Sequence, residues 1–151
     1  MIRVIRSATY PAPADQVWQT LCSLGDLALW HPAVQSSRSV DAPRAHVGAI
    51  RHVATRDGLS MEEELIAFAE CDRRLELLTR TAPVPLSLMW QALTVFGVTA
   101  TDGAVLRWEL RADGAPDWTD RIRVWFGDGY IPAGLHGLAA HLSVQNDKPI
   151  N

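Results

Sequence analysis

The sequence predicts an α+β fold in which a curved antiparallel sheet wraps around one long C-terminal helix and encloses a cavity. The first observation is the order of the hydrophobic patterns: one strand, two short helices, about six strands and a final helix. The second is the pair of hairpin turns, Asp57-Gly58 and Thr101-Asp102-Gly103, each lying between two β-rich runs. A run of strands followed by a helix is typical of an antiparallel sheet that this helix covers.

The first elements follow from local signals. Residues 2–10 alternate like a strand, and Pro13 then suits the first turn of a helix. Apolar residues at helical spacing continue until Gly25, and a second short helix is expected over 26–30, closed by a His-Pro pair. Further strands are expected near residues 34–41, 48–56, 59–69, 74–81, 88–100 and 104–112.

Residues 117–142 form the predicted C-terminal helix, because apolar residues recur there every four positions. Pro132 and two glycines inside this segment predict a kink or a broken turn near 127–132. We expect a single domain over residues 1–143 and a flexible tail over 144–151.

Composition argues against several classes of function. Nearly half of the 151 residues are hydrophobic and the net charge is −3, as in an ordinary globular domain. Lys148 is the only lysine and no Lys/Arg cluster occurs, which argues against nucleic acid or an anionic membrane as a partner. No apolar run reaches the roughly 18 residues that span a bilayer, and we expect no signal peptide. Cys22 and Cys71 are expected to be free thiols of a cytoplasmic monomer or homodimer.

A charged hairpin surrounds the Asp57-Gly58 turn. If these two residues form the whole turn, Arg51 lies opposite Glu64 and Val53 lies opposite Glu62, and all four share one face. Charged groups inside a fold are costly unless they are paired or functional. Two interpretations stay open: a structural Arg51–Glu64 pair with Glu62 at a cavity mouth, or two carboxylates that act as general acid and base.

Several motifs follow one another along about residues 3–142: PAPADQVW (11–18), LALWHP (27–32), GAIR (48–51), DG (57–58) before EL (64–65), and YIPAGLHGL (130–138). In this order and spacing they resemble the helix-grip superfamily, which includes START lipid-transfer domains, the birch-pollen allergen, plant abscisic-acid receptors and polyketide cyclase/dehydrase proteins. The resemblance implies a sheet of about seven strands around the last helix. It also implies that the cavity is lined by His31, Arg51, Val53, Glu62, Glu64, Trp90, Ala92, Trp108, Phe126, Tyr130 and Gly134. Trp30, Leu78 and Arg80 are further candidates for ligand contact.

The resemblance to polyketide cyclase/dehydrase proteins implies an enzyme that acts on a small hydrophobic molecule, such as a polyketide or another secondary metabolite. We expect lyase-type cyclisation or dehydration, with Glu64 or Glu62 as general base and His31 as partner acid or base. Arg51 would orient Glu64 or bind an oxyanion, and Tyr130 would bond to a carbonyl. The histidines show no metal-ligand spacing and no nucleophile motif occurs, so neither a metal nor a cofactor is expected.

Two alternatives to the enzyme remain open. The first is a non-catalytic carrier or sensor of a lipophilic small molecule, which needs the same cavity. The second is a structural protein whose six tryptophans fill that cavity. Large indole rings suit either purpose, because they bind aromatic ligands and also fill space. A cavity of roughly 300 Å³ or more would favour ligand binding over a filled core.

Overall fold

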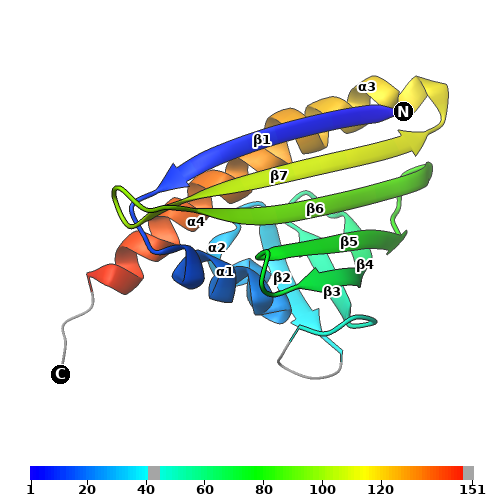
Figure 1. Cartoon of the computed structure of the whole chain (residues 1–151). Helices are drawn as coiled ribbons and strands as arrows, with labels where there is room; N and C mark the ends of the chain where they lie inside the picture. The colour runs from blue at the N-terminus through cyan, green and yellow to red at the C-terminus, as the bar shows by residue number, and fades with distance from the viewer. Residues whose placement is uncertain (41–44, 148–151) are drawn as a thin grey trace.

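A strongly curved antiparallel sheet carries the structure, a computed structural model that describes residues 1–40 and 45–147. Within the described residues the sheet has seven strands in the order β1-β7-β6-β5-β4-β3-β2. Figure 1 shows β1 and β7 at one side of the sheet, β2 and β3 at the other, and the last helix behind it. The strands are β1 (Ile2–Tyr10), β2 (Val34–Ser39), β3 (Ile50–Thr55), β4 (Ser60–Ala69), β5 (Arg74–Thr81), β6 (Leu86–Val98) and β7 (Gly103–Gly114).

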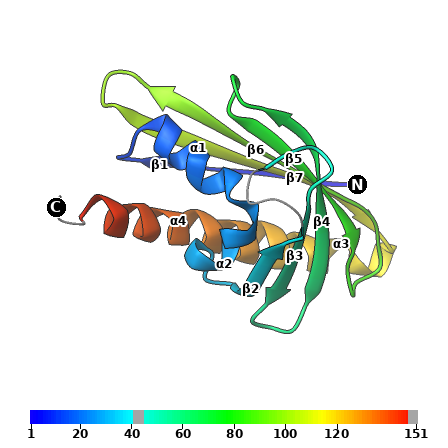
Figure 2. The same ribbon diagram turned by 90° about the horizontal axis from the view of Figure 1, so that it is seen from below.

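The helices lie on the concave side of this sheet. Figure 2 shows the strands curling around the C-terminal helix, with the two N-terminal helices closing one end. The first of these contacts β6 and β7, and the second packs against the C-terminal helix. The helices are α1 (Ala14–Cys22), α2 (Leu27–Trp30), α3 (Thr119–Ile122) and α4 (Ile131–Asn146), with 3-10 turns at Leu24–Asp26 and Pro116–Trp118.

The expected fold and order of elements are confirmed. Every expected strand boundary within the described residues falls within two residues of the observed one. Residue 41, the last of the expected second strand, lies outside the described residues. Turn residues and prolines mark these boundaries in the sequence, so local chemistry was sufficient to predict them.

The register of the β3–β4 hairpin differs from the expected one by one residue. Arg51 pairs with Glu63 and Val53 pairs with Met61, so the pairing of Arg51 with Glu64 and of Val53 with Glu62 was wrong. The loop has three residues, 56–58, because the Thr55 N–H donates to the Leu59 carbonyl at 2.8 Å.

The loop chemistry explains this length. The Thr55 hydroxyl accepts a hydrogen bond from the Leu59 N–H at 3.0 Å, and Gly58 has a φ of +94°, which a three-residue hairpin loop requires at its last position. A one-residue slip turns every side chain of a strand to the other face. Glu63 of β4 therefore faces the interior, and Glu62 and Glu64 face outward.

The C-terminal segment differs from expectation in two places. The irregularity expected near 127–132 takes the form of a π-helix over Arg123–Tyr130, which begins earlier than expected, and Pro132 lies in the first turn of α4, where its missing N–H is tolerated. The helix α4 then continues to Asn146, so residues 144–146 are helical rather than part of a flexible tail. Residues 148–151 lie outside the described residues.

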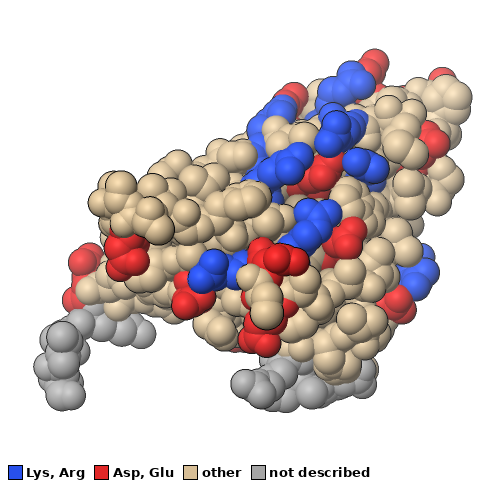
Figure 3. All heavy atoms as spheres, in the orientation of Figure 1, with Lys and Arg blue, Asp and Glu red and all other residues tan. Residues whose placement is uncertain are grey.

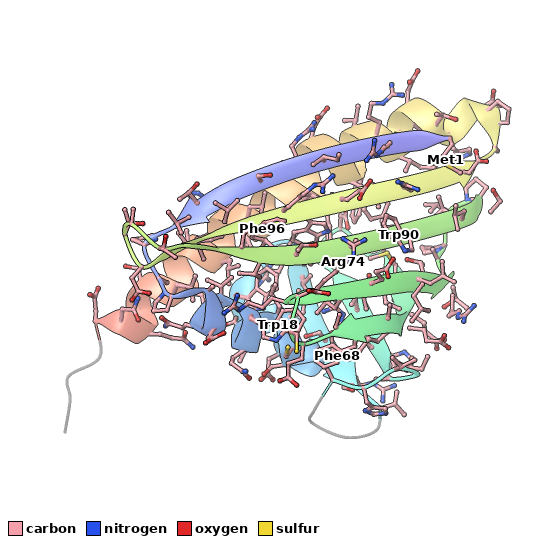
Figure 4. All side chains as sticks on the ribbon, viewed as in Figure 1. Met1, Trp18, Phe68, Arg74, Trp90 and Phe96 are labelled. Atoms are coloured by element: carbon pink, nitrogen blue, oxygen red, sulfur yellow. The ribbon has the colours of Figure 1, made fainter. Side chains whose placement is uncertain are left out.

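Aromatic and apolar side chains fill the space beneath the N-terminal helices. Trp18 of α1 stacks on Phe68 of β4, with ring centroids 5.4 Å apart, and Figure 4 shows the two side chains together. A β-bulge between Leu65 and Ala67 turns Phe68 inward. At the end of β1, the Tyr10 hydroxyl donates a hydrogen bond to the Leu135 carbonyl at 2.8 Å, which links β1 to α4.

Two glycines let α4 approach the α2–β2 connection very closely. A Cβ atom at Gly137 would lie 2.1 Å from the Trp30 carbonyl oxygen and 2.4 Å from Cδ of Pro32. A Cβ atom at Gly134 would lie 2.7 Å from the His31 ring. A side chain at Gly137 would require the backbone to move, and one at Gly134 would require the buried His31 and Trp108 rings to move, so this end of the interior is tightly closed.

We predict that Gly137→Ala destabilises the fold, because the new methyl group overlaps backbone and proline atoms. Overpacking of this kind costs about 1–3 kcal/mol, which should lower the melting temperature by several degrees. Gly129→Ala is the matched control in the same helical segment, since its Cβ would meet only the Val124 carbonyl at 3.7 Å. It should leave stability unchanged or raise it by up to about 1 kcal/mol. Equal melting temperatures for the two variants would contradict the close packing of α4.

Candidate functional site

A row of polar side chains crosses the inner face of the sheet. Arg51 of β3 donates two hydrogen bonds to Oε1 of Glu63, at 3.2 Å from Nε and 2.9 Å from Nη2. Gln91 of β6 donates to the other carboxylate oxygen, Oε2, at 2.8 Å. The Gln91 carbonyl accepts a hydrogen bond from the indole of Trp108 on β7 at 2.9 Å. Side chains from four strands are thus joined into one network.

The Arg51–Glu63 pair is withdrawn from solvent. Glu63 is 1% exposed and Arg51 is 6% exposed. Burying two charges costs several kcal/mol per ion, and close pairing with further hydrogen bonds offsets that cost. Both oxygens of Glu63 accept hydrogen bonds, so this carboxylate is not a free base. Its position instead holds the Arg51 guanidinium in the interior.

The imidazole of His31 lies at the end of α2, buried against α4. Its Nδ1 accepts a hydrogen bond from the Ala33 N–H at 3.2 Å, which places the proton of the neutral ring on Nε2. Nε2 has no hydrogen-bond partner of normal geometry, although the Tyr130 backbone carbonyl is near enough to favour the protonated ring. Burial, with a further contribution from the Arg51 charge, lowers the pKa of His31 to about 4. At neutral pH the ring is therefore an uncharged N–H donor.

Tyr130 packs against both His31 and Trp108 in the interior. Its ring lies 4.2 Å from the His31 ring and 6.1 Å from that of Trp108, measured between centroids. Burial raises the pKa of the Tyr130 hydroxyl strongly, the Glu63 charge raises it further, and Arg51 opposes the shift. Tyr130 therefore stays protonated and can donate a hydrogen bond.

The rings of Trp30, His31, Trp108, Trp125, Phe126 and Tyr130 contact one another and form an aromatic cluster. An apolar pocket of about 420 Å³ opens beside this aromatic cluster. It lies between the tip of the β3–β4 hairpin, the β5–β6 connection and the segment from α3 into the π-helix. Its inner wall reaches the cluster because Trp125 stacks on Tyr130, at 5.3 Å and an interplanar angle of 17°. The pocket is lined by Asp57, Leu59, Pro83, Val84, Trp118, Arg121, Ile122, Trp125 and Phe126.

A larger hollow of about 490 Å³ lies elsewhere, among α1, α2 and α4. Mostly polar side chains line it, such as Gln16, Gln19 and Asp26, and of the aromatic cluster it reaches only Trp30. Ligand pockets are mostly apolar with a few polar groups. We therefore take the 420 Å³ pocket, not the larger hollow, as the candidate site.

The structure brings together some of the residues predicted from the sequence and separates others. Those on the concave side of the sheet or facing it from a helix are Trp30, His31, Arg51, Val53, Trp108, Phe126, Tyr130 and Gly134. Those on the convex outer face, where the prediction of an inward position was wrong, are Glu62, Glu64, Leu78, Arg80, Trp90 and Ala92.

The outward residues have partners on the surface. Glu64 accepts a hydrogen bond from Arg80 at 2.6 Å, and Glu62 lies 3.4 Å from Nδ1 of His52. Figure 3 shows this face, on which acidic and basic side chains lie next to one another across the strands.

Trp90 shows why strand β6 was assigned to the wrong faces. Its indole donates to Glu76 at 3.0 Å and its ring lies beneath Arg111, and Figure 4 shows Trp90 beside Arg74 on the face away from α4. Both faces of β6 carry apolar residues, so alternation alone does not distinguish them.

Sequence reasoning missed Glu63, Gln91 and the aromatic wall around Trp125. Glu63 was available as the middle residue of three consecutive glutamates, and only the loop length selects it. Gln91 was detectable as the one polar residue among Met89, Leu93 and Val95 on the same face. Asp57 was noticed only for its turn, although its carboxylate lines the pocket.

Within residues 1–40 and 45–147, no group of three or more His, Cys, Asp or Glu side chains is placed to hold a metal ion. In the same part of the chain, no helix is both long and apolar enough to cross a membrane.

Comparison with known proteins identifies relatives in family and fold. A family model described as "Polyketide cyclase / dehydrase and lipid transport" matches residues 1–143. XoxI of Bacillus cereus has 23% sequence identity and a TM-score of 0.81, with 96% of this chain and 99% of that chain covered. A protein of Thermobifida fusca, solved by NMR, has 24% identity and a TM-score of 0.81, with 100% of both chains covered. Comparison with curated proteins gave no match.

The same fold also occurs in a plant enzyme. Norcoclaurine synthase of Thalictrum flavum, in complex with dopamine and hydroxybenzaldehyde, has 14% identity and a TM-score of 0.76, with 99% of this chain and 89% of that chain covered. At such low identities, the likeness to these solved structures shows a shared fold and no more.

We predict that Glu63→Gln lowers the free energy of unfolding by about 3–5 kcal/mol, because it leaves the buried Arg51 charge without a counter-charge. Glu64→Gln is the matched control, one residue along the same strand, and breaks only the partly exposed pair with Arg80. It should cost less than about 1 kcal/mol. Urea unfolding measures both values, and a larger cost at Glu64 would contradict the observed register.

We also predict a pH dependence of stability that comes from His31. Its pKa is about 4 in the folded protein and about 6.5 when unfolded, so the unfolded chain binds more protons between these values. Above about pH 6.5 the ring is neutral in both states and the free energy of unfolding is not reduced by it. As the pH falls towards 4, protonation of His31 in the unfolded chain lowers the free energy of unfolding by on the order of 3 kcal/mol. His31→Gln should remove this part of the decline, whereas Gln at the exposed His136 should not. An NMR titration that gave His31 a pKa near 6.5 would contradict the assignment.

Proposed function

The chain belongs to the polyketide cyclase/dehydrase and lipid transport family, and from this premise we propose that it binds a small, largely apolar molecule beside its last helix. The observation that carries the proposal is the 420 Å³ pocket at the β3–β4 hairpin tip. Its volume exceeds the roughly 300 Å³ expected of a ligand site, and most of its lining residues are apolar or aromatic. This favours ligand binding over an interior filled entirely by tryptophans.

The polar groups behind the pocket would orient the bound molecule. Tyr130 lies directly behind Trp125 and keeps its proton, so its hydroxyl can donate a hydrogen bond to an oxygen atom of a ligand that reaches it. Arg51 and Glu63 neutralise each other, and therefore the interior offers no net charge to a charged ligand. A neutral molecule with one acceptor oxygen fits this combination best.

Catalysis of a cyclisation or dehydration is the second candidate. The observation that favours it is Tyr130, a protonated hydroxyl beside a buried ion pair, which could stabilise negative charge on a carbonyl oxygen. In this candidate Glu63 acts as a positioning residue for Arg51, because its own oxygens are occupied. Norcoclaurine synthase shares this fold and was solved in complex with two aromatic molecules, dopamine and hydroxybenzaldehyde. The fold is therefore compatible with an enzyme as well as with a carrier.

The neutral fluorescent probe N-phenyl-1-naphthylamine tests the location of binding. We expect Val84→Asp to weaken probe binding at least tenfold, because it places a charge in the apolar pocket. The control is Leu29→Asp, which places the same charge in the larger hollow at an exposed residue of α2. This control should change the affinity less than twofold. Loss of binding in the control alone would move the site to the larger hollow.

The fate of the natural ligand distinguishes carrier from enzyme. Native mass spectrometry of the purified protein should detect a bound molecule, which can then be isolated and returned to the protein. A carrier releases it unchanged, whereas an enzyme converts it or its precursor. If conversion occurs and Tyr130→Phe leaves its rate unchanged, the role proposed for Tyr130 in catalysis is wrong.

A further inference from the structure

The indole of Trp125 occupies a slot at the inner end of the apolar pocket. One face of the ring lies against Tyr130, with centroids 5.3 Å apart and planes inclined by only 17°. Its edge meets Phe126 at 4.2 Å and an angle of 76°. At the rim, its Nε1–H donates a hydrogen bond to Oδ2 of Asp57. The side chain is therefore held by one aromatic stack and one hydrogen bond to a carboxylate.

Asp57 is the only carboxylate among the residues that line this pocket. It lies at the tip of the β3–β4 hairpin, and the hydrogen bond from Trp125 joins this tip to the π-helix. Its other oxygen accepts a hydrogen bond from the Thr55 hydroxyl, which orients the carboxylate. These bonds lower the pKa of Asp57, with the Thr55 bond making the largest contribution, so the group is ionised at neutral pH.

The backbone around Trp125 is suited to a change of position. Trp125 lies within the π-helix Arg123–Tyr130, and π-helical segments are rare and frequently found at functional sites. Gly127 and Gly129 follow it, and glycine lowers the stability of a helix by about 1 kcal/mol relative to alanine. The indole itself is only partly buried and forms a wall of the pocket.

We propose that Trp125 occupies the place of the ligand's own ring. The ligand is then a planar aromatic molecule with an N–H or O–H donor at its edge. It stacks on Tyr130 and donates to Asp57 after the Trp125 indole swings out. This inference rests on the proposed function, since it names the class of molecule that the pocket takes.

The geometry also indicates which aromatic molecules would bind less well. A ring without a donor would not replace the bond that the indole makes to Asp57, so it would gain one charge-assisted hydrogen bond less than a ring with a donor. An aromatic acid would place a second negative charge beside Asp57. The only cation among the pocket residues, Arg121, lies over the Trp118 ring, with its guanidinium carbon 5.0 Å from the ring centroid.

Two probes of matched size test the inference: 2-naphthol, which has a hydroxyl donor, and naphthalene, which has none. Trp125→Ala empties the slot, and we expect it to bind 2-naphthol at least tenfold more tightly than the unaltered protein does. It should also prefer 2-naphthol over naphthalene by at least tenfold. Adding Asp57→Ala to this variant should reduce that preference to less than threefold, because the acceptor is gone. Equilibrium fluorescence titration measures each dissociation constant.

A second variant covers the case in which Trp125→Ala does not fold. Trp125→Phe keeps an aromatic ring but lacks the N–H, and it should bind 2-naphthol about threefold more tightly than the unaltered protein. The inference would be overturned if 2-naphthol bound the unaltered protein and all variants with equal affinity, or if the preference for 2-naphthol persisted without Asp57. Either result would leave the proposed binding of an apolar molecule in the pocket unaffected. If neither naphthalene nor 2-naphthol bound any of these chains, the proposed function would fail as well.

Discussion

The buried ion pair between Arg51 and Glu63 is the constraint on which the interior depends. A guanidinium that faces the core of a sheet needs a carboxylate at the same depth, and only one residue of β4 reaches it. Gln91 donates to Glu63 a hydrogen bond that water would supply at the surface, and the Trp108 indole in turn holds the Gln91 amide in place by a hydrogen bond. The network crosses the sheet from β3 to β7, so the inner face of each strand is defined relative to the others.

The fold could be predicted from the sequence because local sequence patterns indicate its strands and helices. Prolines, glycines and the change of hydrophobic period mark every strand and helix, and the C-terminal segment was recognised as irregular. The site was less accessible, since it depends on which face each residue takes. The hydrogen bonds of Thr55 set the loop length and thereby the register of β4. In this register Glu63 faces the interior, where Glu62 and Glu64 had been predicted. For Trp90 and Ala92, apolar residues on both faces of β6 concealed the true alternation.

The two ends of the interior have opposite characters. At one end, Gly134 and Gly137 bring α4 against His31 and the Trp30 backbone, and aromatic rings fill the remaining space. At the other end, the helix widens into a π-turn and an apolar pocket opens beside it. The closed end supplies rigidity and an uncharged environment, while the open end provides access. The irregular helix thus lies between the packed core and the apolar pocket.

The run Glu62-Glu63-Glu64 has a consequence for how the hairpin folds. A hairpin that closes one residue out of register still offers Arg51 a carboxylate, so charge pairing alone does not reject the misregistered state. Rejection comes from the loop, whose Thr55–Leu59 hydrogen bonds fit one register, and from Met61 and Leu65, which lose their place in the core when the strand is turned over. The three glutamates therefore introduce local frustration into the folding landscape. The loop hydrogen bonds of Thr55 and the burial of Met61 and Leu65, rather than the charge pair, therefore select the observed register.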